Sequence, residues 1–313
     1  MPTPKPFLTY EQQLYKLTSE KNLVINDREY AEKMLKQIGY FALVSGYKEL
    51  FRNPTTKKYK DGTTFEEIVA LYKFDASLRE LFLKHLLIIE QKMRSLLSYY
   101  FTEHYGEKQL HYLSRTSYNY IPKHEAGIDR LIDTFRNIAL KSTDYYYITH
   151  QRNKHGNVPL WVLVKVLTFG NMLYMYRYLP QKLQIAISKN FEKVNEKELF
   201  QYLQVLTKYR NVCAHNERLF SYRTKDNIPD TSVHAKLGIL KKGSQYTCGK
   251  NDLYSVVIAF RYLLEREDFK QFKGRLGMTI NQFVTMTTNV TESELLMKMG
   301  FPVNWKKISS YKI

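Results

Sequence analysis

The chain has 313 residues, of which 48 are Lys or Arg and 30 are Asp or Glu, so its formal net charge is +18. Its 44% hydrophobic content, with only 9 Pro and 13 Gly, predicts a folded chain with one large core or two modest ones and excludes disorder. No apolar run reaches the roughly 18 residues of a membrane helix, no signal peptide is evident and the two cysteines form no disulfide framework, so we expect a cytoplasmic protein.

Apolar residues recur at helical spacing along most of the chain without an alternating strand series, which predicts a mainly α fold. The longest predicted helix begins at a capping box of Thr64 and Glu67 and persists to about His104. We expect this helix to be the structural spine. The other predicted elements are a short helix at 9–21, a helix at 27–39, an apolar helical stretch at 40–51, a basic loop or hairpin at 52–63, a helix at 128–140, one helix at 159–179, a motif helix at about 196–220, a basic surface connection at 224–250, a helix at 253–264 and lesser helices at 269–286 and 293–299.

Two opposite-charge pairs stand at i,i+4 spacing on the predicted spine, Asp75 with Arg79 and Glu90 with Arg94. Such pairs are usually surface salt bridges that contribute a few tenths of a kcal/mol. Both pairs border the apolar stripe of the helix, however. We therefore keep two interpretations open for Glu90 and Arg94, a surface pair or a role near the functional site.

Aromatic and basic residues gather at 143–157, where the helical pattern breaks. Tyr146, Arg152 and Lys154 combine a ring for base stacking with cations for phosphates, which predicts an RNA-contacting loop. His150 and His155 have no acidic or cysteine partners at ligand spacing, so we predict no metal site there. The net charge of +18, with 26 Tyr and 17 Phe, favours nucleic acid over a membrane as partner.

The run YRNVCAHNERLF at 209–220 places Arg210, Asn211 and His215 within six positions. On an ideal helix Asn211, His215 and Arg218 share one face, and Arg210 projects beside the opposite, apolar stripe. That stripe is formed by Leu199, Leu203, Leu206 and Cys213. The polar cluster is either a solvated helix face or a cationic, titratable site.

The arginine, asparagine and histidine match the RNxxxH motif of HEPN-domain ribonucleases, and RNVCAHNERLF resembles the signature of the Abi (abortive infection) family in its AbiD/AbiF-like branch. Family-like blocks at 37–51, 62–95 and 159–176 extend the resemblance over roughly residues 5–222. The resemblance implies a HEPN-like helical bundle over 1–222, with 223–313 as a basic connection and a helical segment that is either separate or packed on the same core. HEPN toxins often carry a tyrosine two positions after the histidine, where this chain has Glu217.

This resemblance implies a metal-independent endoribonuclease of an anti-phage or toxin-antitoxin system that needs no cofactor. RNA supplies its own nucleophile, the 2′-hydroxyl, so the protein needs a proton-transfer group and a cation for the developing charge. His215 would transfer the proton, Arg210 would hold the phosphate, and Asn211 would orient one of them; the product would carry a 2′,3′-cyclic phosphate. The alternative is a non-catalytic RNA-binding protein, regulated by a small non-coding RNA or a protein partner.

A single copy of the motif leaves the polar face of the motif helix without an opposite wall. HEPN domains typically pair with two motifs facing across a cleft, so the resemblance implies a symmetric homodimer. The alternative is that the segment after Ser221 folds over the site and a monomer suffices.

Overall fold

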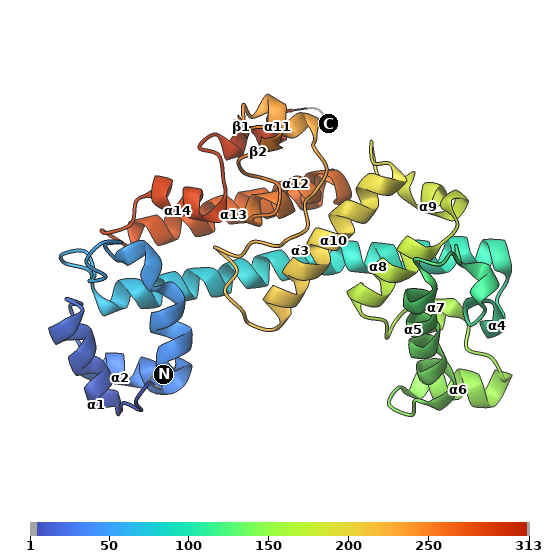
Figure 1. Cartoon of the computed structure of the whole chain (residues 1–313), viewed down its shortest axis with the longest axis horizontal. Coiled ribbons are helices and arrows are strands. Elements are labelled where there is room, and N and C mark those ends of the chain that lie inside the picture. The colour runs from blue at the N-terminus through green and yellow to red at the C-terminus, as the bar shows by residue number, and fades with distance from the viewer. Residues whose placement is uncertain (1–4, 312–313) are drawn as a thin grey trace.

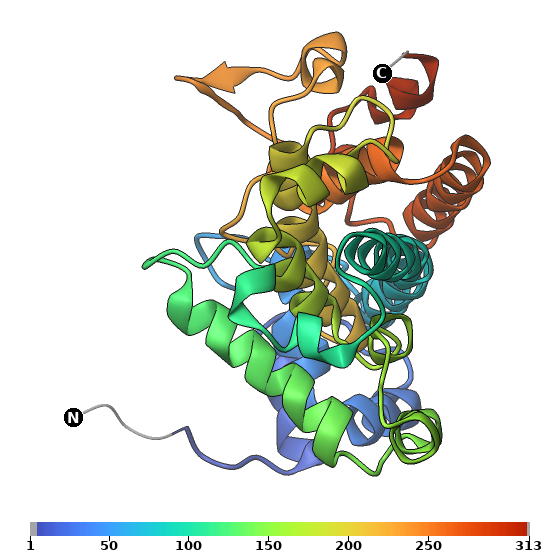
Figure 2. The same cartoon turned by 90° about the vertical axis from the view of Figure 1, so that its right-hand side faces the viewer.

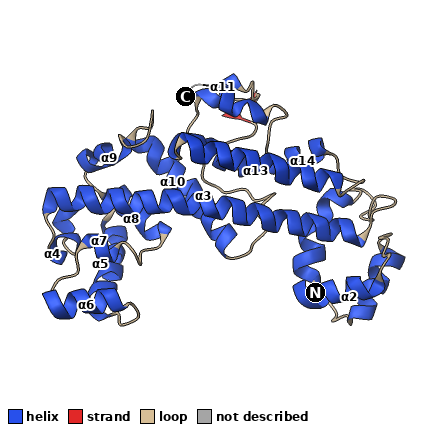
Figure 3. Cartoon of the chain, turned by 180° about the vertical axis from the view of Figure 1, so that it is seen from behind, coloured by secondary structure: helices blue, strands red, loops and turns tan. Residues whose placement is uncertain are grey.

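The structure, a computed structural model, describes residues 5–311 and is mainly helical, as predicted (Figure 3). Its α-helices are α1 (Tyr10–Tyr15), α2 (Arg28–Ile38), α3 (Phe65–Tyr105), α4 (Gln109–Tyr112), α5 (Glu125–Arg136), α6 (Tyr146–His155), α7 (Leu160–Leu163), α8 (Phe169–Tyr178), α9 (Gln181–Ser188), α10 (Glu196–Ala214), α11 (Ser232–Lys236), α12 (Leu253–Leu263), α13 (Arg266–Thr285) and α14 (Glu292–Met299). Short 3-10 or π turns are η1 (Lys16–Glu20), η2 (Phe41–Ser45), η3 (Lys48–Phe51), η4 (Arg115–Ser117), η5 (Asn137–Lys141) and η6 (Trp305–Ser310), and the strands β1 (Lys241–Lys242) and β2 (Gln245–Tyr246) form one antiparallel hairpin.

Helix α3 is the spine that the sequence predicts. The Thr64 hydroxyl accepts from the Glu67 amide at 3.2 Å and the Glu67 carboxylate accepts from the Thr64 amide at 3.0 Å, so the predicted capping box is confirmed. The helix continues for 41 residues, about 60 Å at the usual rise, and ends at Gly106, whose φ of 91° favours glycine. It spans the length of the molecule in Figure 1.

The remaining helices are arranged along α3 in three groups (Figure 1). Helices α1 and α2 lie below one end of α3 and α4 to α8 below the other, while α12 to α14 lie above it. Helix α10 crosses α3 obliquely and packs on it, so its last turn reaches the lower side (Figures 1 and 2). The spine thus carries the motif helix at its middle.

The segment after residue 222 packs on the same core as the rest. Helix α12 contacts α10 and α13, and α13 lies along α3. Phe82 of α3 meets Phe260 of α12 and Phe272 of α13, with ring centroids 5.8 and 5.1 Å apart. Ten of the eleven residues of α12 are buried, so this helix is an interior element of the fold. Within residues 5–311 there is no helix with the length and apolar character needed to cross a membrane.

Three predicted elements besides the motif helix differ from the structure. The single helix expected at 159–179 is two helices, α7 and α8, because Thr168 and Asn171 form a capping box that starts α8 anew. The segment 143–157 contains helix α6 where a loop was predicted; Ile148 is its only buried residue, so it carries almost no apolar periodicity. The connection at 224–250 includes α11 and the β1–β2 hairpin.

Candidate functional site

Helix α10 turns its apolar side to the core and the Asn211 side of the motif to the solvent, as the apolar spacing predicts. The Asn195 side chain accepts from the amides of Lys197 and Glu198 at 3.0 and 2.9 Å, which starts the helix. Its predicted apolar stripe is buried, while Asn211 is exposed. The buried stripe consists of Leu199, Leu203, Leu206 and Cys213. The core contacts of this stripe therefore fix which way the motif faces.

The helix ends earlier than predicted, at Ala214, so the expected motif helix to about 220 is wrong. His215 caps the helix, and Asn216 takes the left-handed conformation at φ 57°. The Glu217 amide then donates to the Val212 carbonyl at 3.0 Å, which is the bond pattern of a Schellman motif. Asparagine tolerates this conformation better than most residues, so Asn216 was the sequence signal for the helix end. His215 consequently stands exposed at the helix terminus.

Arg210 is held by a buried carboxylate of the spine. Its Nε donates to Glu90 Oε2 at 3.2 Å, and Glu90 Oε1 accepts from Arg94. Arg94 also donates to the carbonyls of Val164 and Leu167, each at 3.1 Å, so its guanidinium is tied to the core by three bonds. We call Glu90, Arg94 and Arg210 the Glu90 cluster. One carboxylate between two guanidiniums leaves a net positive charge, and the Arg210 side chain keeps 27% of its surface exposed to offer it.

A second buried carboxylate of the spine, Asp75, holds the chain just after the motif. It accepts from the Leu219 and Phe220 amides at 3.0 and 2.6 Å, and from Arg79 at 2.8 Å. It also accepts from the Tyr47 hydroxyl at 2.7 Å, and the Tyr47 ring stacks on Phe220. Both i,i+4 pairs of the spine therefore have a fully buried carboxylate, and neither is a surface salt bridge.

The other predicted site residues lie in different places. Arg218 follows the helix and donates to the Gly46 carbonyl. Tyr146, Arg152 and Lys154 belong to α6, at the end of the molecule that α4 to α8 occupy, and are not brought to the motif (Figure 1). Arg152 donates to the carbonyls of Ala139 and Ser142, each at 3.0 Å, whereas Tyr146 and Lys154 are exposed. Arg152 thus stabilises a turn.

The side chains of Asn211 and His215 make no hydrogen bond within residues 5–311 and have no wall opposite them. Residues 223–311 lie mainly on the other side of α3 (Figures 1 and 2). They do not bury either side chain, so the alternative in which this segment covers the site is not what the structure shows. A substrate or a second protein surface could approach freely.

The geometry of the described residues supports neither a cysteine nucleophile nor a metal site. Burial raises the pKa of the Cys213 thiol to about 12, so this cysteine stays protonated and is a poor nucleophile. In the described part of the chain, no group of three or more His, Cys, Asp or Glu side chains is placed to hold a metal ion.

The sequence analysis did not assign Asp75 a role at the motif, because its partners Leu219 and Phe220 lie 144 and 145 residues away in sequence.

Comparison with known proteins gives one match. A family model described as Abi-like protein matches residues 33–221, which include the end of α2, all of α3 to α10, the Glu90 cluster and the motif. No curated protein and no solved structure matches significantly.

Proposed function

Because the chain belongs to the family of Abi-like proteins, whose name refers to abortive infection, we propose that it is a metal-independent endoribonuclease of such a system. The observation that carries the proposal is that one helix bears both an exposed His215 at its terminus and an Arg210 that a buried carboxylate holds in place. An exposed imidazole can reach a substrate, and a fixed guanidinium can hold a phosphate through its fork of donors.

In the proposed reaction the 2′-oxygen of a ribose attacks the adjacent phosphorus and the 5′-oxygen of the next nucleotide leaves. The products are a 2′,3′-cyclic phosphate and a 5′-hydroxyl end. His215 carries the proton transfer, for which an imidazole is suited because it can both accept and donate a proton. Arg210 stabilises the charge that develops on the phosphate oxygens, and Asn211, one turn before His215, orients the imidazole or the phosphate. Glu90 and Arg94 act through Arg210 as positioning residues.

A second candidate function is RNA binding without turnover. The specific observation in its favour is that nothing in one protomer orients the side chains of Asn211 and His215. A catalytic imidazole usually has a hydrogen-bond partner that fixes its orientation. Under this alternative the motif docks a phosphate, and the RNA that copurifies with the protein would be a defined small species.

The deciding experiment incubates the purified chain with single-stranded RNA in the presence of a chelator. We expect cleavage that leaves 2′,3′-cyclic phosphate ends, loss of cleavage in His215→Ala, and retained RNA binding by that variant. His155→Ala, which removes an exposed histidine of α6, is the matched control and should cleave like the wild type. A substrate with 2′-deoxyribose at the cleaved position should resist. Cleavage that stops with chelator, or that persists in His215→Ala, would overturn the proposal.

A further inference from the structure

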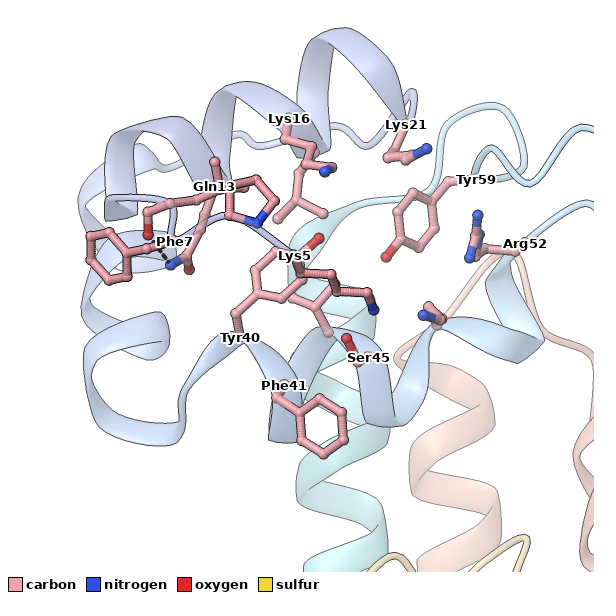
Figure 4. A pocket seen from close by; sticks show the side chains of 15 residues that line it. Lys5, Phe7, Gln13, Lys16, Lys21, Tyr40, Phe41, Ser45, Arg52 and Tyr59 are labelled. Atoms are coloured by element: carbon pink, nitrogen blue, oxygen red, sulfur yellow. Dashed lines mark hydrogen bonds between the residues drawn. The ribbon is translucent and has the colours of Figure 1, made fainter. Parts of the chain in front are cut away.

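A basic pocket lies away from the motif, between the amino-terminal segment, the first helix and the segment 40–52 (Figure 4). Its volume is about 590 Å³, within the range of small-molecule sites. Residues 5–8 and the α1–η1 helix form one wall, and residues 40–52 with Tyr59 form the other. It is thus an open, partly walled chamber at the end of the molecule that α1 and α2 occupy.

Positive charge dominates this pocket. Five cationic side chains line it, and the described residues of its wall include no carboxylate. Within residues 5–311 none of the four lysines among them forms an ion pair, and Glu49 pairs instead with Lys298 at 2.7 Å. Burial, and then the charges of Arg52 and Lys5, lower the pKa of Lys48. The five cations are Lys5, Lys16, Lys21, Lys48 and Arg52. Uncompensated like charges at close range favour an anionic occupant.

Aromatic groups complete the pocket. Phe41 and Phe7 are 85% and 87% exposed at its rim, which is unusual for large apolar rings in a folded protein. Tyr40 and Tyr59 direct their hydroxyls toward the chamber (Figure 4), and neither hydroxyl has a hydrogen-bond partner within residues 5–311. Burial raises the pKa of both phenols, so they remain donors at neutral pH. Exposed rings beside cations are the usual surfaces for stacking an unpaired base.

We propose that this pocket binds a nucleoside phosphate, with the phosphate among its lysines and the base against Phe41 or Phe7. The four lysines, which form no ion pair within residues 5–311, and the phenol donors suit phosphate oxygens, and the exposed rings suit the base. A simple anion would use the cations but leave the rings without a role. The nucleotide is either a free mononucleotide or the unpaired 5′ end of an RNA strand, which offer the same chemistry.

The position of the pocket relates it to the motif without making it part of the motif. Between the pocket residues Ser45 and Lys48 lie Gly46 and Tyr47. The Gly46 carbonyl accepts from Arg218, and the Tyr47 hydroxyl donates to Asp75. The pocket itself contains none of Arg210, Asn211 and His215. Its occupancy can therefore be tested independently of any cleavage.

The test measures binding to the full chain by titration calorimetry. The probes are AMP, adenosine, inorganic phosphate and polyglutamate, together with a 2′-O-methylated pentanucleotide with a 5′-phosphate or a 5′-hydroxyl, which cannot be cleaved through its 2′-oxygen. We expect AMP or the 5′-phosphorylated pentanucleotide to bind at least tenfold more tightly than adenosine or phosphate. Tighter binding of AMP assigns the pocket to a free nucleotide, and tighter binding of the phosphorylated pentanucleotide assigns it to a strand end.

Three variants locate the binding. Lys48→Met should weaken it about tenfold, since it removes a charged donor, and Phe41→Ala should weaken it about fivefold or more by removing a stacking face. Phe41 is so exposed that its loss should leave the fold intact, which a thermal melt checks. Lys58→Met makes the same charge change at an exposed position outside the pocket and should bind like the wild type. Absence of nucleotide binding, equal affinity for phosphate or polyglutamate, or equal loss in Lys58→Met would overturn the proposal.

Discussion

Arg210 of the motif helix and Glu90 of the spine are joined by a bond of 3.2 Å from Nε to Oε2, across 120 residues of sequence. Glu90 is fully buried and also accepts from Arg94. A buried carboxylate is costly unless paired, and here two guanidiniums compensate it. The negative charge of Glu90 is therefore shared between two arginines and neutralises the charge of Arg210 only in part. The same carboxylate fixes the position of the Arg210 guanidinium.

Replacing Glu90 by Gln keeps the side-chain shape and removes the charge that holds Arg210. We expect RNA cleavage to slow by about 100-fold, because small misplacements of a positioned group have effects of that order. RNA affinity should not weaken, since the variant leaves more free positive charge at the site. Rates and binding constants measured separately check this. Glu80→Gln, at an exposed position of the same helix, is the control. A Glu90→Gln variant with unchanged turnover would show that the bond has no part in the reaction.

Assembly can be tested by mixing two inactive variants. The exposed, unpartnered Asn211 and His215 motivate a symmetric homodimer in which two motifs face each other. If one site uses groups from both protomers, a mixture of His215→Ala and Arg210→Ala protomers should regain about one quarter of the wild-type rate, because random pairing gives half heterodimers with one intact site each. Each variant alone stays inactive. Light scattering that shows a monomer at full nuclease activity would contradict the dimer.

Asp75 should be a strong determinant of stability. In Asp75→Asn an amide nitrogen replaces one of the two oxygens and so faces either the Leu219 or the Phe220 amide, and Arg79 loses its charged partner in a buried place. Breaking a buried pair in this way typically costs about 3–5 kcal/mol of unfolding free energy. Chemical denaturation measures it. Asp129→Asn breaks the exposed pair with Arg115 and should cost much less, because water screens that pair. Equal costs for the two variants would contradict the role given to Asp75.

The buried histidine of the spine should make stability depend on pH. His85 packs against Phe272 and its Nδ1 donates to the Leu81 carbonyl at 2.8 Å. Burial lowers the pKa of this imidazole. At acidic pH the unfolded chain then binds a proton at this histidine that the folded chain does not bind. The contribution of neutral His85 to the free energy of unfolding is therefore lost as pH falls below about 6.5. We expect His85→Leu to become more stable relative to the wild type at pH 5 than at pH 8, by thermal melts. His155→Leu should show no such change, and a parallel response of both variants would refute the assignment.

Local signals predicted most of the helices. The capping box at Thr64 and the apolar stripe of α10 are confirmed because each depends on residues only one or two turns apart. The two helix boundaries that were predicted wrongly also have local causes. At Thr168 a capping box lies inside an apolar run and divides it, and at Asn216 a left-handed residue ends the motif helix six residues before the predicted position.

The candidate site was predictable in its residues but not in its construction. Spacing placed Asn211 and His215 on one exposed face, and the i,i+4 pattern singled out Glu90 with Arg94. No local pattern could show that Glu90 meets Arg210, or that Asp75 receives the Leu219 amide, because tertiary packing of α10 on α3 creates those bonds. Composition grouped Tyr146, Arg152 and Lys154 as RNA contacts, but composition carries no information on where α6 lies in the fold.

Because α12 is an interior element, the part of the chain that packs around one core is longer than the region that the family model matches. Sequence similarity defines a family region that stops at residue 221, yet the aromatic cluster of Phe82, Phe260 and Phe272 joins that region to helices beyond it. A gene fragment cut at the family boundary would leave apolar faces of α3 and α10 open to water, and such patches promote aggregation. Expression of a 33–221 fragment should therefore give insoluble or misfolded material. Relatives that share only the family region must cover these faces with other sequences or with other chains.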